Sequence, residues 1–100
     1  MTMEPLQPGE ALMLGLVHEL IRHPPSHEDI DHDDNNAPWL KIPAQSISHL
    51  LLSRYMLAFS VRQARTGLNG LVEKGFLLRT QRIGSNKGRS TYFYRLPGDI

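Results

Sequence analysis

The chain has 100 residues, of which 40% are hydrophobic, and a formal net charge of +1; these values suit one folded domain with a modest core. It contains no cysteine, which excludes disulfide frameworks and thiolate metal sites. No apolar run approaches the ~20 residues that cross a bilayer, and the first ten residues lack the basic start of a secretory signal. We therefore expect a cytoplasmic protein with no membrane partner.

Charge is unevenly distributed along the sequence. Residues 1–50 carry two cations and eight acids, a net −6, whereas residues 51–100 carry nine cations and two acids, a net +7. A basic half of this kind favours a polyanionic partner.

The first predicted element follows a tail of residues 1–8 and is a helix over residues 9–23. Pro24 and Pro25 end it, because proline removes a backbone donor and clashes with the preceding turn. Its apolar side chains sweep an arc of roughly 200°, wider than the ~100° stripe of a one-sided helix. The excess indicates a second buried face, either inside the fold or in a homodimer formed through this helix. The acidic stretch 24–38 that follows predicts a mobile loop.

The middle of the chain predicts a short strand and a second helix. Residues 39–43, WLKIP, alternate between apolar and polar, as strands do. From about residue 44 to about residue 54, Ile47, Leu50 and Leu51 repeat with helical spacing.

A third helix is predicted from the N-cap Ser60 to Lys74, with Gln63 placed for a capping box. Gly75 is the predicted C-terminal stop. Interior glycines at 67 and 70 each cost ~1 kcal/mol relative to alanine, and Asn-Gly is also a hairpin signal. Helical apolar spacing nevertheless continues through both glycines, so a helix is favoured.

The C-terminal part predicts a β-hairpin with a basic tip. Residues 76–83 and 91–96 are rich in β-forming residues, and the turn-forming residues 84–90 separate them.

This order of elements, from Trp39 to Leu96, resembles the winged helix-turn-helix superfamily of DNA-binding regulators. The resemblance is strongest over residues 60–96 and includes a Leu-x-x-Leu-x-x-x-Gly-Phe pattern that ends at Gly75 and Phe76. It implies an α+β winged helix-turn-helix domain over residues 9–100, with three helices, a short first strand and a C-terminal hairpin as the wing. In that superfamily the third helix typically enters the major groove, and the wing often reaches the backbone or minor groove.

The candidate interface follows from the helical positions of the polar residues. Arg62, Thr66 and Asn69 are expected opposite the apolar side of the third helix, where arginine can bind guanine and asparagine can bind adenine. Gly70 is expected on the same side, leaving room for close approach. Gln63 either caps the helix or contacts DNA, and the Ser60 amide could face a phosphate. With the wing cations, which suit phosphates or a minor groove, the DNA-binding set is Ser60, Arg62, Gln63, Thr66, Asn69, Arg82, Lys87 and Arg89.

No catalytic motif is recognisable in the sequence. It lacks a P-loop, a dinucleotide-binding glycine motif and a nucleophile elbow, so we expect no enzyme activity, no catalytic residue and no cofactor. The histidines and acids of residues 24–38 match no zinc or EF-hand spacing, so no metal site is expected. The predicted function is sequence-specific binding of double-stranded DNA by a small transcriptional regulator. A winged-helix protein-interaction module, or a DNA-binding component of replication or plasmid maintenance, remains an alternative.

Overall fold

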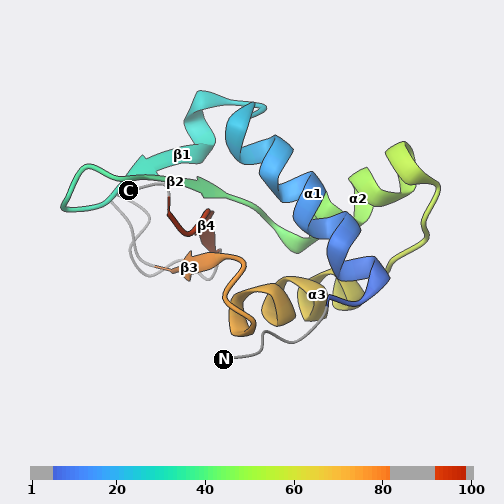
Figure 1. Cartoon of the computed structure of the whole chain (residues 1–100). Helices are drawn as coiled ribbons and strands as arrows, with labels where there is room; N and C mark the ends of the chain where they lie inside the picture. The colour runs from blue at the N-terminus through green and yellow to red at the C-terminus, as the bar shows by residue number, and fades with distance from the viewer. Residues whose placement is uncertain (1–5, 82–91, 99–100) are drawn as a thin grey trace.

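The chain folds into three helices and a small antiparallel sheet, an α+β arrangement (Figure 1). The computed structural model describes residues 6–81 and 92–98. The elements in chain order are α1 (Pro8–Arg22), the 3-10 turn η1 (His27–Asp29), β1 (Ile30–His32), β2 (Pro38–Lys41), α2 (Ala44–Tyr55), α3 (Val61–Glu73), β3 (Leu78–Thr80) and β4 (Phe93–Arg95). The three predicted helices and the strand between the first two are thus present, with boundaries within a few residues.

The sheet has the strand order β1-β2-β4-β3, and all neighbouring strands are antiparallel. The last strand of the chain is therefore inserted between β2 and β3. Tyr94 of β4 lies opposite Leu40 of β2 on one side and Arg79 of β3 on the other. This pairing ties the strand after α3 to the strand before α2.

One hydrophobic core lies between the helices and the sheet. Its buried members are Met13, Leu16, Val17, Leu20, Leu40, Ile42, Ile47, Leu51, Ala64, Leu68, Leu71, Leu77, Tyr94 and Leu96. Leu14 and Ile21 of α1 are partly buried against the same core, whereas Leu12 is 37% exposed. The fold itself thus covers most of the wide apolar arc of α1.

The prediction that residues 24–38 form a loop without regular structure is wrong for part of this stretch. It contains η1 and β1, and β1 pairs with β2. The Asp33 carboxylate organises the turn between the two strands: its Oδ1 accepts hydrogen bonds from the backbone N–H groups of Asn35 and Ala37, each at 2.9 Å. Its Oδ2 accepts one from Trp39 Nε1 at 3.0 Å. Local side-chain bonding of this kind can specify a hairpin turn with little apolar content.

The predicted tail of residues 1–8 also needs a correction at its end. Leu6 packs against the core. Gln7 is the N-cap of α1, which begins at Pro8, and its backbone N–H donates to Glu10 Oε1 at 2.9 Å. Proline suits this first helical position, where its missing N–H leaves no bond unmade.

Candidate nucleic-acid interface

The start of α3 is fixed by the predicted capping box. Ser60 Oγ accepts a hydrogen bond from the Gln63 backbone N–H at 3.0 Å, and Gln63 Oε1 accepts one from the Ser60 N–H at 2.8 Å. Of the two alternatives for Gln63, the structure has capping. The Ser60 N–H, which is expected from the sequence to face a phosphate, instead donates to Gln63 Oε1 within the capping box. These two residues therefore set where the helix begins.

The end of α3 is fixed as the sequence predicts. Gly75 has a positive φ of +86°, its N–H donates to the Val72 carbonyl, and the Phe76 N–H donates to the Leu71 carbonyl. This pair of bonds is a Schellman motif, which stops a helix at a left-handed residue.

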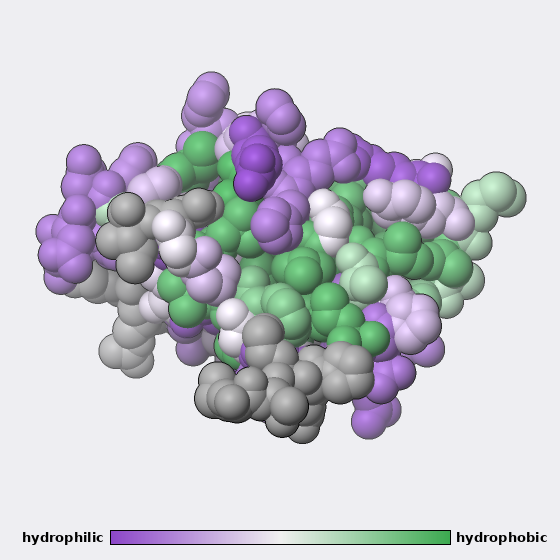
Figure 2. All heavy atoms as spheres, viewed as in Figure 1, coloured by the Kyte–Doolittle hydropathy of each residue, from purple (hydrophilic) through white to green (hydrophobic). Residues whose placement is uncertain are grey.

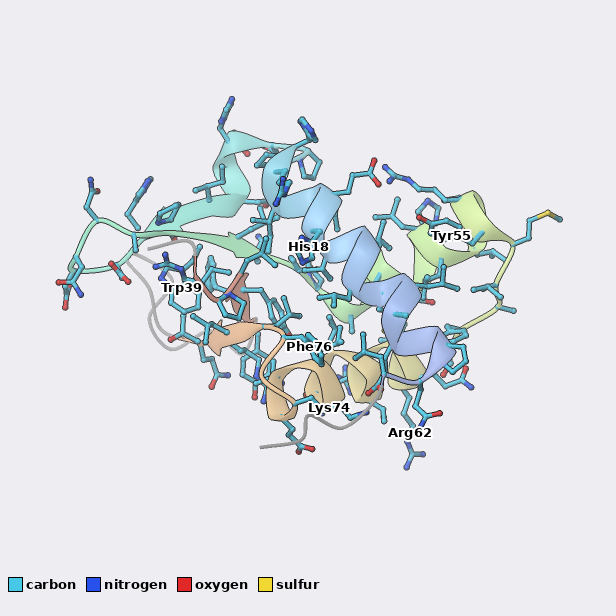
Figure 3. All side chains as sticks on the ribbon, in the orientation of Figure 1. His18, Trp39, Tyr55, Arg62, Lys74 and Phe76 are labelled. Carbon is cyan, nitrogen blue, oxygen red and sulfur yellow. The ribbon has the colours of Figure 1, made fainter. Side chains whose placement is uncertain are left out.

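The contacts of α3 divide it into a buried side and an exposed side. Ala64, Gly67, Leu68 and Leu71 are buried. The exposed residues of the helix are Val61, Arg62, Gln63, Arg65, Thr66 and Glu73. In Figure 3, Arg62 projects away from the body of the protein from the first turn of α3. Among the residues described, the side chains of Arg62, Arg65 and Thr66 have no hydrogen bond or ion pair.

Gly70 does not lie on the exposed side, which corrects the expectation that it leaves room for DNA. A Cβ at this position would come closer than 3.0 Å to Glu10 Oε2 of α1. Glu10 Oε1 accepts a hydrogen bond from Lys74 Nζ at 2.6 Å, and both side chains are largely buried. Together with the Gln7 N–H, the Lys74 bond lowers the pKa of the Glu10 carboxyl below its usual 4.5. The room at Gly70 serves the packing of α1.

Asn69 lies at the edge of the exposed side and has a partner that the sequence did not reveal. Its Oδ1 accepts a hydrogen bond from the guanidinium of Arg79 on β3. The same guanidinium stacks on the ring of Tyr92, 4.4 Å from its centroid. The positive charge of Arg79 close to Tyr94 partly offsets the rise in the pKa of Tyr94 caused by burial. Arg79 thus joins α3 to the sheet beside the exposed side of the helix.

A pocket of about 540 Å³ adjoins this surface. The first turn of α2, Arg65 of α3 and Tyr92 before β4 are among its walls. Because Arg65 also belongs to the exposed side of α3, the pocket and the exposed side form one continuous surface. We call this surface the α3 face and define it by Arg62, Arg65, Thr66, Asn69 and Tyr92.

The remaining predicted contacts, Arg82, Lys87 and Arg89, lie outside the described residues. Within the described ranges no helix is long and apolar enough to cross a membrane. Over the same ranges, histidine and acidic side chains form no group of three that could hold a metal ion.

Sequence reasoning missed Arg65 and Tyr92 as members of this surface and Arg79 as its support. Arg79 stands on a predicted strand, and its partner Asn69 is ten residues away, so no local periodicity links them.

Comparison with family models, with curated proteins and with solved structures gives no match for this chain.

Proposed function

We propose that this chain binds double-stranded DNA as a winged helix-turn-helix domain, with α3 in the major groove. The order of elements and the sheet pairing support the proposal. A strand between the first two helices pairs with the second strand of the C-terminal hairpin, and α2 and α3 pack together across a short turn. Ser48 Oγ of α2 donates to the Phe59 carbonyl in that turn at 2.5 Å, which holds α3 in a fixed orientation.

The observation that carries the proposal is the exposed polar side of α3. Arg62, Arg65 and Thr66 are exposed without partners among the described residues, while the opposite side of the helix is buried. A 13-residue helix is about 20 Å long, and the major groove, ≈ 12 Å wide, admits one helix. Arginine donates to phosphates and to the guanine edge, so this side of α3 has suitable chemistry.

The positions of the acids support an orientation on DNA. Asp31, Asp33 and Asp34 belong to the β1–β2 hairpin, which extends to the left in Figure 1, whereas Arg62 projects at the lower right in Figure 3. Phosphates repel carboxylates and attract guanidinium groups. The protein would therefore approach DNA with α3 first and with the hairpin directed away.

The test is a salt titration of binding to double-stranded DNA, followed by selection of bound sequences from a random pool. If Z phosphates are contacted, log K should fall with log salt at a slope of about −0.9Z. Arg62→Ala should weaken binding and relax selectivity. Arg22→Ala is the matched control, because this substitution removes the same charge as Arg62→Ala. Arg22 is exposed in the last turn of α1, away from the α3 face. Equal losses in both variants would count against the α3 face.

Regulation of transcription is the specific role that we propose for such binding. A DNA-binding component of replication or plasmid maintenance would give the same result in a binding assay. The sequences recovered by selection, mapped to promoters or to replication origins, would distinguish these roles.

A protein-interaction module is the second candidate, and one observation favours it. Figure 2 shows apolar residues across the centre of the α1 side and toward its right-hand end. Leu52, Tyr55 and Met56, at the end of α2, are 55%, 42% and 87% exposed. Absence of DNA binding even at low salt, where phosphate contacts are strongest, would leave this candidate standing and end the first.

A further inference from the structure

The pocket that adjoins α3 has a mostly apolar wall with one charged side chain. Ile42, Leu68 and Tyr94 are buried at its base, and Val61 lies at its exposed edge. Arg65 is the one charged residue among the described residues that line it. Its volume of about 540 Å³ falls within the roughly 300–1,000 Å³ of pockets that hold small molecules, which pair apolar walls with a few orienting polar groups.

The charge around this pocket is positive, and no carboxylate neutralises it in the described part of the chain. Arg65 forms no ion pair or hydrogen bond there. A second guanidinium, that of Arg79, stacks on the wall residue Tyr92 at 4.4 Å from the centre of the ring. The hydrogen-bond partner of Arg79, the Asn69 oxygen, is neutral. Two guanidinium groups without a carboxylate partner favour an anion at this place.

An anion with an apolar body matches both properties of the pocket. A carboxylate accepts two parallel hydrogen bonds from a guanidinium, so Arg65 is suited to hold the charged end of such a ligand. An attached ring or hydrocarbon chain would cover the apolar wall and gain free energy from removing that surface from water. A bare anion uses the charge alone, and a neutral hydrocarbon uses the wall alone.

We infer that this pocket binds a small carboxylate with an apolar body, and that the bound carboxylate keeps DNA off the α3 face. Arg65 belongs to both sites, so donors that hold the carboxylate are not available to a phosphate, and the added negative charge repels the DNA backbone. Only the exclusion of DNA rests on the proposed function. By linkage, DNA should lower the affinity for the carboxylate by the same factor as the carboxylate lowers the affinity for DNA.

The first measurement is binding of naphthoate to the full chain without DNA, followed by NMR. Naphthamide has the same rings without the charge, and acetate has the charge without the rings. Each should bind at least about tenfold more weakly than naphthoate, and the largest shifts with naphthoate should fall on Val61, Arg65 and Tyr92. Naphthamide or acetate binding as tightly as naphthoate, or no binding of naphthoate, would overturn the inference.

Two substitutions test the position of the ligand. Arg65→Met keeps an apolar stem and removes the charge, so it should weaken naphthoate binding by about tenfold. Arg22→Met is the matched control, because it removes the same charge from an exposed site on α1 and should leave naphthoate binding unchanged. Val61→Trp, at an exposed position, retains Arg65 but fills the pocket and should also weaken binding. Unchanged affinity in Arg65→Met and Val61→Trp would overturn the assignment of this pocket.

The last measurement is competition between naphthoate and double-stranded DNA at constant ionic strength. Naphthoate should weaken DNA binding, whereas acetate at the same concentration should not. Naphthoate that binds without affecting DNA would overturn the exclusion, and DNA binding without any naphthoate binding would overturn the whole inference while the proposed function stands. Naphthoate binding by a protein that binds no DNA would overturn the proposed function and the exclusion and leave the carboxylate site standing.

Discussion

Gly67 of α3 lies directly against the side chain of Met13 of α1. A Cβ at Gly67 would stand closer than 3.0 Å to both the sulfur and the terminal methyl group of Met13, a separation that real Cβ atoms essentially never show. Met13 is only 1% exposed, so its thioether end would have to shift inside the core to admit a Cβ at Gly67. The close approach of α1 and α3 therefore depends on glycine at this position.

Gly67→Ala should destabilise the protein despite the better helix propensity of alanine. Overpacking of a tight core costs about 1–3 kcal/mol, and alanine returns up to about 1 kcal/mol in propensity. We expect a net loss of about 1 kcal/mol in the free energy of unfolding, measured by urea denaturation. Gly15→Ala is the control, because Gly15 is helical and exposed and its Cβ would have no neighbour within 4 Å. It should raise stability by about 0.5–1 kcal/mol, and stabilisation by both variants would refute the packing argument.

Met56 offers a substitution that should stabilise the protein. It has a φ of +56°, and around it the Met56 N–H donates to Leu52 and the Leu57 N–H to Leu51. A left-handed residue that is not glycine is strained by about 1 kcal/mol. Met56→Gly should therefore raise the free energy of unfolding by about 0.5–1 kcal/mol. Ala58→Gly is the control: Ala58 has no positive φ, so glycine there should lower the free energy of unfolding. A loss of stability in Met56→Gly would show that its 87% exposed side chain makes a contribution that the contacts do not reveal.

The Glu10–Lys74 ion pair should make stability depend on acid pH. Lys74 lowers the pKa of Glu10 below 4.5 in the folded state, so the stabilisation is present above the unfolded value and is lost as pH falls through the folded pKa. Glu10→Gln should cost about 1 kcal/mol at pH 7. It should also flatten the loss of stability below about pH 4.5, as measured by thermal melts across pH. Parallel pH profiles for Glu10→Gln and the wild-type protein would contradict the assignment.

Asp33 and Trp39 provide a local reporter of the β1–β2 hairpin. The hydrogen bond from Trp39, followed by that from the Ala37 N–H, lowers the pKa of the Asp33 carboxyl below its usual 3.8. Since Trp39 is the one tryptophan in the chain, its fluorescence should change as pH falls below 3.8 and Asp33 becomes protonated. Asp33→Asn should show the altered emission already at pH 7. Asp34→Asn, which changes an exposed neighbour, should leave the emission and its titration unaltered.

The features that sequence reasoning predicted are those that local patterns determine. Helical spacing and the Ser60 and Gly75 caps identify α3 without knowledge of its neighbours. The β1 strand was missed because Ile30 is its one apolar residue, and its place in the sheet depends on β2 and on the turn at Asp33. Turn chemistry in the Asp33–Asn36 segment was the available signal, since Asp and Asn favour turns.

The parts of the candidate site that sequence reasoning misplaced depend on contacts between distant segments. Gly70 is helical as predicted, but which side of α3 it occupies is settled by Glu10, sixty residues away. Asn69 is exposed on a helical projection, whereas its amide is oriented by Arg79 of β3. Periodicity assigns a residue to a side of a helix and carries no information about which segment packs there.

The most direct test of the proposed DNA-binding surface is an NMR titration of the isotopically labelled protein with double-stranded DNA at low salt. The proposal predicts that the largest backbone and side-chain shifts fall on Arg62, Arg65, Thr66 and Tyr92, while residues of the β1–β2 turn stay unchanged. Shifts confined to that turn or to the exposed end of α2, or no shifts at DNA concentrations where binding should saturate, would contradict it.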